Sequence, residues 1–104
     1  MSNNETSVKH FFYYIRNKFN QPKTTVCIAI SQTSIARGMT ICSKKLTPKK
    51  EIGRTIAKGR ADKGIETGLD FMDKESKFFT VVSNPILSKI EMRFFESYQK
   101  QIST

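Results

Sequence analysis

The chain has 104 residues, of which 38% are hydrophobic and 11% aromatic, and its net charge is +9. This length fits one domain with a core of its own, which excludes wholesale disorder. The sequence has no run of about 18 apolar residues and no secretory signal at its start, so we expect no membrane span. With only two cysteines, we expect a cytoplasmic protein. The positive charge favours nucleic acid as a partner, then an acidic protein, and a membrane surface least.

Residues 1–9 are polar and predict a flexible N-terminus, followed by a single domain over residues 10–104. In the segment 10–16, HFFYYIR, bulky residues alternate on both faces and predict a first strand. Asn20-Gln21-Pro22 then predicts a turn, because proline fixes φ and asparagine tolerates turn geometry. The only histidine, His10, lies at the start of this strand. We expect it to have a structural role there rather than a catalytic one.

Residues 24–31, TTVCIAIS, give the clearest strand pattern, and the segment 34–42 predicts its partner strand. Gln32-Thr33 would join them as a two-residue hairpin loop, although a longer loop stays open because these residues are uncommon in such turns. The two-residue loop places Cys27 opposite Gly38. One face of the hairpin then carries only small residues, which would let a helix approach closely: Cys27, Ala29, Ala36, Gly38, Thr40 and Cys42.

A helix is predicted to begin at Thr47-Pro48, where a capping residue precedes a proline. Gly64 or Gly68 should end it. Ile52 and Ile56 lie one turn apart and predict an apolar stripe on this helix.

Small residues follow one another at a spacing of four along the same helix, at Gly53, Ala57 and Ala61. They predict a ridge that lies flat on the small face of the hairpin. The interior glycines Gly53 and Gly59 each weaken a helix by about 1 kcal/mol relative to alanine, which indicates close backbone approach at both positions.

Residues 64–76 hold four of the nine acids and predict a connection. The segment 77–83, KFFTVVS, predicts another strand, and Asn84-Pro85 would open a second helix that runs to about residue 101. The order β-β-β-α-β-α predicts an α+β domain, in which an antiparallel sheet of three to four strands packs against two helices. The buried stripe of the second helix is predicted at Leu87, Ile90, Phe94 and Tyr98.

The charge is concentrated between residues 44 and 63, where eight Lys or Arg residues stand against two acids, a local net charge of +6. Within the predicted helix, basic residues recur every four positions on one face, roughly 6 Å apart, as contacts to successive phosphates require. The helix N-terminus also favours an anion. A site for nucleic acid or a partner protein is therefore predicted at Lys44, Lys45, Lys49, Lys50, Arg54, Lys58 and Arg60.

Arg37 is included in this site, although it falls in an otherwise apolar stripe of the hairpin, where an unpaired cation would be costly. It either extends its charged end to solvent, pairs with an acid, or reaches a ligand, and the structural interpretations are favoured over the last. The aromatic residues Phe12, Tyr13 and Tyr14 would suit stacking on bases, but core packing is their more common role.

No catalytic centre is predicted. Cys27 and Cys42 are 15 positions apart and lack a second pair or a histidine partner, so we expect structural cysteines rather than zinc ligands. The acids between residues 62 and 73 match no cation-binding loop, and the glycines match no phosphate-binding loop. We therefore expect a protein without a metal, a cofactor or enzymatic activity.

The run ARGMTICSKKLTPKKEIGRTIAKGRA, with the preceding FFYYIRNKFNQPKTTVCIAI, resembles small proteins encoded by bacteriophages and prophages, whose function is mostly uncharacterised. The resemblance spans about residues 11–63 and is most specific at Arg37-Gly38, Gly53-Arg54 and Gly59-Arg60-Ala61. It implies a phage accessory protein that acts in the cytoplasm of a bacterial host, with no inherited catalytic residues. Small phage proteins of this kind often bind nucleic acid or disarm a host defence system.

The leading hypothesis is a small basic phage accessory protein that binds DNA or RNA through the helix 48–63 and the loop before it. The alternative is an inhibitor of a host defence complex, an anti-CRISPR or anti-restriction protein, that acts by binding protein. An exposed apolar patch at residues 11–14, or at Phe94, Phe95 and Tyr98, would favour the alternative. A homodimer formed through the sheet is compatible with both.

Overall fold

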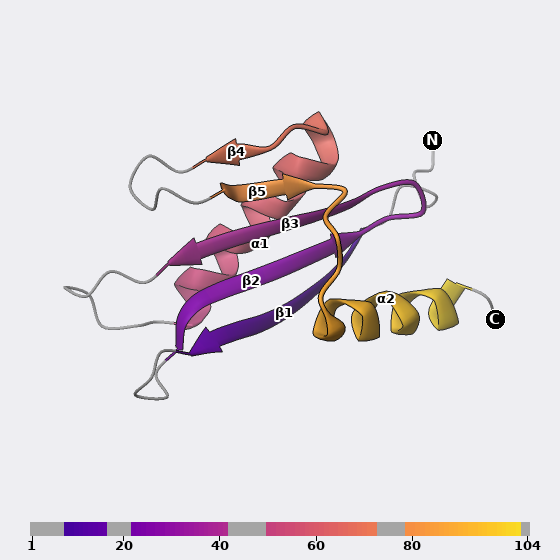
Figure 1. Ribbon diagram of the computed structural model, residues 1–104, viewed down its shortest axis with the longest axis horizontal. Coiled ribbons are helices and arrows are strands. Elements are labelled where there is room, and N and C mark those ends of the chain that lie inside the picture. The colour runs from indigo at the N-terminus through magenta and orange to yellow at the C-terminus, as the bar shows by residue number, and fades with distance from the viewer. Residues whose placement is uncertain (1–7, 17–21, 42–49, 73–78, 103–104) are drawn as a thin grey trace.

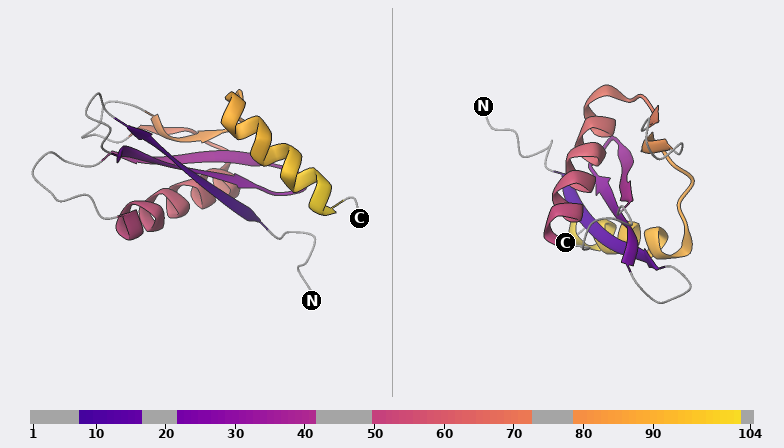
Figure 2. Two further views of the ribbon diagram at one scale, coloured as in Figure 1. Left: turned by 90° about the horizontal axis from the view of Figure 1, so that it is seen from below. Right: turned by 90° about the vertical axis from the view of Figure 1, so that its left-hand side faces the viewer.

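A computed structural model of the chain describes residues 8–16, 22–41, 50–72 and 79–102. One antiparallel sheet with the strand order β1-β2-β3-β5-β4 carries a helix on each face (Figures 1 and 2). The α+β fold is confirmed. The sheet has five strands because Phe71–Met72, predicted within a connection, pairs with β5. The elements are β1 (Lys9–Arg16), β2 (Pro22–Ile30), β3 (Ile35–Ile41), α1 (Lys50–Thr67), β4 (Phe71–Met72), β5 (Phe79–Ser83) and α2 (Lys89–Ile102).

The β2–β3 hairpin has the predicted register, with Cys27 opposite Gly38. Its loop is the two-residue Gln32-Thr33, across which the Ser31 N–H donates to the Ser34 carbonyl at 2.8 Å. The Ser31 hydroxyl oxygen also accepts a hydrogen bond from the Ser34 N–H at 3.0 Å. This serine side chain supports a tight turn that the two central residues do not favour by themselves.

The small-residue face of the hairpin is covered by α1, as predicted. A Cβ built on Gly38 would lie 2.2 Å from the Ala57 carbonyl oxygen and 2.3 Å from the Ala61 nitrogen, so the helix backbone touches the strand at this point. A Cβ on Gly53 would lie 2.6 Å from the Thr25 hydroxyl oxygen, but one on Gly59 would meet nothing within 4 Å. The expectation of close approach is therefore confirmed for Gly53 and wrong for Gly59.

The apolar stripe predicted for α1 is not its buried face. Ile52 is 54% exposed and Ile56 39% exposed, because the small residues on the neighbouring side of the helix take the place against the sheet. The predicted start at Thr47-Pro48 lies outside the described residues. The helix ends before Gly68, which has a φ of +68° and donates its N–H to the Gly64 carbonyl at 2.9 Å.

The opposite face of the sheet is covered by α2, which begins four residues later than Asn84-Pro85 predicted. Ser88 caps the helix: its hydroxyl accepts a hydrogen bond from the Glu91 N–H at 3.3 Å, and its own N–H donates to the Glu91 carboxylate at 3.0 Å. Asn84 instead adopts a φ of 51° and donates its N–H to the Ile35 carbonyl. Pro22, predicted within a turn, is likewise the first residue of β2.

The buried side of α2 is built from aromatic residues and one acid. Phe94 stacks on Phe11 with ring centroids 5.0 Å apart, and Tyr98 packs against the β2 isoleucines. Ile90, predicted in the buried stripe, is 46% exposed, and the adjacent Glu91 is fully buried in its place.

Candidate nucleic-acid interface

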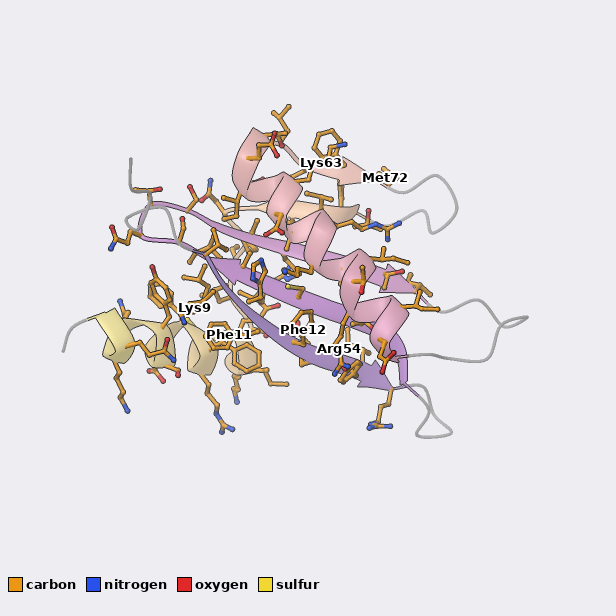
Figure 3. All side chains as sticks on the ribbon, turned by 180° about the vertical axis from the view of Figure 1, so that it is seen from behind. Lys9, Phe11, Phe12, Arg54, Lys63 and Met72 are labelled. Carbon is orange, nitrogen blue, oxygen red and sulfur yellow. The ribbon has the colours of Figure 1, made fainter. Side chains whose placement is uncertain are left out.

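The basic residues of α1 that the structure brings together are Arg54 and Lys58, both exposed. They lie one and two turns before Asp62, the α1 residue that contacts His10 of β1, so both are on the flank of α1 that borders β1. Figure 3 shows Arg54 on this side of the helix. Lys50 begins α1 one turn earlier, but its side chain is outside the described part of the chain. Three further predicted residues also lie outside it: Lys44, Lys45 and Lys49.

Aromatic residues of β1 line the same region. Phe12 pairs with Cys27 across the β1–β2 ladder and packs against the core beneath α1, so β1 turns this ring toward the α1 side of the sheet. Tyr14 lies two residues further along and therefore on the same face. Both rings are partly buried. The flank of α1 thus combines exposed cations with the aromatic side of an edge strand, and we call this surface the α1–β1 flank.

Near the C-terminal end of α1, the α1–β1 flank is bounded by His10 of β1. The His10 Nε2 lies 2.6 Å from an Asp62 carboxylate oxygen, with the two side chains 19% and 46% exposed. Asp62 is one turn beyond Lys58, so the run of cations stops there. The contact fixes β1 to α1, which agrees with a structural role for the histidine.

Arg60 lies on the other side of α1. Its guanidinium donates to the Met39 carbonyl at 2.7 Å. Among the residues that the structure describes, β5 pairs with β3 over Ala36–Gly38. Arg60 therefore donates a hydrogen bond to β3 just beyond that paired stretch. The structure therefore separates Arg60 from the α1–β1 flank and gives it a structural contact.

Arg37 pairs with a buried acid on the α2 side of the sheet. Its Nε and Nη2 lie 2.8 and 2.5 Å from the two carboxylate oxygens of Glu91, and Nη2 also donates to the Ile86 carbonyl. The Tyr13 hydroxyl donates to the same carboxylate at 2.6 Å. Of the interpretations left open for Arg37, pairing with an acid is the one that these contacts support.

The charges of this cluster are mutually stabilised. Burial alone would raise the pKa of Glu91, but the hydrogen bonds from Arg37, Tyr13 and the Ser88 N–H together hold it below its ordinary value. The hydrogen bond to Glu91 raises the pKa of Arg37, and burial, helped by that carboxylate, raises the pKa of Tyr13 to about 12. Sequence reasoning missed Glu91. The available signals were the Ser88-to-Glu91 capping spacing and the need of Arg37 for an acid.

Other chemistry has little support among the described residues. Cys27 is fully buried, and burial raises the pKa of its thiol to about 12, so the thiolate that reacts as a nucleophile is scarce at neutral pH. No group of three or more His, Cys, Asp or Glu side chains there could hold a metal ion. In the same part of the chain, neither helix is long and apolar enough to cross a membrane.

Comparisons with protein-family models, with curated proteins and with solved structures found no match to this chain.

Proposed function

We propose that this protein is a non-enzymatic accessory protein that binds nucleic acid, DNA or RNA, through the α1–β1 flank. The observation that supports this function is the exposed pair Arg54 and Lys58, one helical turn apart, beside the aromatic face of β1. Cations at this spacing suit successive phosphates, and aromatic rings at a strand edge suit unpaired bases. The chain also carries three lysines within the six residues before α1, which adds to the attraction.

The test is fluorescence anisotropy of labelled single- and double-stranded DNA and RNA, titrated with protein between about 50 and 200 mM salt. The variant Arg54→Ala/Lys58→Ala removes two phosphate contacts. For double-stranded DNA, the slope of log affinity against log salt should therefore become shallower by about 1.8. The fold should be unchanged, because both side chains are exposed.

The matched control is Lys89→Ala/Arg93→Ala. These residues are also exposed cations one turn apart on a helix, but α2 lies on the opposite face of the sheet. The control should keep the wild-type salt slope. Equal losses in both double variants would mean that the charge acts as a whole and would refute the assignment to the α1–β1 flank.

A second candidate function, inhibition of a host defence complex by protein binding, is favoured by a different surface than expected. The residues of the two patches named for it are partly buried or buried rather than exposed: Phe11 stacks on Phe94, and Tyr98 is 4% exposed. On α1, two apolar side chains are exposed one turn apart, Ile52 and Ile56, and they lie on the flank of the helix away from β1. Tight, nuclease-insensitive binding to a purified defence complex, lost in Ile52→Lys/Ile56→Lys but kept in Arg54→Ala/Lys58→Ala, would support this function over the first.

A further inference from the structure

In the described part of the chain, β1 is an edge strand, and none of its neighbours there covers its outer side along most of its length. Within the described residues it pairs only with β2, over all eight of its positions. Edge strands usually carry an inward charge, a proline or a bulge in their middle, because these features prevent pairing with another chain. β1 has its charged residues Lys9 and Arg16 at its two ends, and its one irregularity falls between Ile15 and Arg16. The segment from His10 to Ile15 is therefore free of these protective devices.

We propose that β1 pairs antiparallel with β1 of a second copy of this chain, with Tyr13 opposite Tyr13 of the partner subunit. A two-fold axis perpendicular to the sheet keeps each face in common, so the α1 sides and the α2 sides of the two copies align. On the α1 side, Phe12 then lies opposite Tyr14 of the partner subunit. Aromatic pairs opposite one another stabilise neighbouring strands.

The exposure of Ile15 selects this register. Ile15 lies on the same face of β1 as Phe11 and Tyr13, the face that α2 covers, yet it is 49% exposed because it is beyond the helix. In the proposed register, each Ile15 lies opposite Phe11 of the partner subunit, beside the stack of Phe11 on Phe94. Centring the pair on Phe12 instead would place Ile15 opposite Lys9 and leave it in water.

Each copy has a net charge of +9, so the two copies repel each other. Salt screens this repulsion. Charges are screened beyond about 8 Å at 0.15 M ionic strength and beyond about 3 Å at 1 M. The dimer should therefore become more stable as salt rises. Binding of nucleic acid should weaken over the same range, so failure of the dimer and failure of the proposed function give different results.

The test is sedimentation velocity of the full chain from about 10 to 200 µM protein, at about 0.15 and 0.5 M salt, without nucleic acid. We expect a dimer that strengthens with salt. Ile15→Lys should weaken it at least about tenfold, because two symmetric contacts are lost in each dimer. The control Met72→Lys introduces a lysine at a position that is 54% exposed and lies on β4, at the opposite edge of the sheet from β1, and it should dimerise as the wild type does.

Two outcomes would overturn the inference. One is a monomer at every concentration and salt. The other is a dimer that Ile15→Lys and Met72→Lys leave equally strong, since the interface would then lie elsewhere. Circular dichroism should show both variants folded, because both side chains are exposed in the single copy.

Discussion

Replacing Glu91 by leucine tests whether the buried cluster holds α2 on the sheet. Glu91 is fully buried, whereas the Arg37 side chain is 19% exposed. In Glu91→Leu, the guanidinium loses both carboxylate contacts, and the Tyr13 hydroxyl and the Ser88 N–H lose their acceptor. Removing one partner of a buried pair costs about 3–5 kcal/mol. Because Arg37 reaches partly into solvent, we expect the lower end, about 3 kcal/mol.

The double variant Arg37→Met/Glu91→Leu replaces both charges with apolar side chains of similar size. Such replacements are often neutral or stabilising, so stability should return to within about 1–2 kcal/mol of the wild type. The coupling energy between the two positions should therefore reach about 2 kcal/mol or more.

Urea unfolding followed by circular dichroism measures the cycle. A domain of this size has a slope of about 1–3 kcal/mol per M, so a loss of about 3 kcal/mol should lower the midpoint of Glu91→Leu by about 1–3 M. Single-variant losses that simply add in the double variant would refute the reasoning. A loss of stability below about 1 kcal/mol in Glu91→Leu would also refute it, because an ion pair exposed to solvent contributes no more than that.

Three further predictions concern the close contact at Gly38 and the pH dependence of the buried cluster. Gly38→Ala should destabilise the protein by at least about 2 kcal/mol, because the new Cβ would meet the backbone of α1. Gly59→Ala should stabilise it by up to about 1 kcal/mol, because the new Cβ would meet nothing and alanine favours the helix. Urea unfolding midpoints measure both changes. The pKa of Glu91 is lowered by folding, so its contribution is complete above the ordinary value of 4.5 and is lost as pH falls through the lower folded pKa. Acid titration should therefore destabilise Arg37→Met/Glu91→Leu less than the wild type. The pKa of Tyr13 is raised by folding, so stability should fall between pH 10 and about 12 in the wild type, and less in Tyr13→Phe.

The parts of the fold that could be predicted are those that local patterns determine. The alternation in β2 and β3, with a two-residue loop, fixes the register, and that register exposes the small face on which α1 lies. The start of α2 could not be predicted in this way. Asn84-Pro85 and Ser88 both resemble helix caps, and the choice depends on Glu91, which must reach a cation on a distant strand.

The candidate site was predictable to a similar extent. The spacing of Arg54 and Lys58 is a property of one helix, so it could be read from the sequence. Arg37 and Arg60 were placed in the same site because charge alone does not show which cations have partners. Their contacts, to Glu91 and to the Met39 carbonyl, join residues 54 and 21 positions apart, and no local pattern contains such pairs.

The position of Glu91 also bears on how the chain is completed during synthesis. Every strand of the sheet and the whole of α1 precede it, so Arg37 has no acid until the last helix has been made. Until then the face that carries Ile28 and Ile30 is open to water. A chain that stops short of α2 would therefore display a folded layer with an apolar side, which is the feature that chaperones and proteases recognise in unfinished proteins. When α2 packs on the sheet, it covers Ile28 and Ile30 and at the same time supplies Glu91 to Arg37. The exposed apolar face is then no longer available to chaperones or proteases.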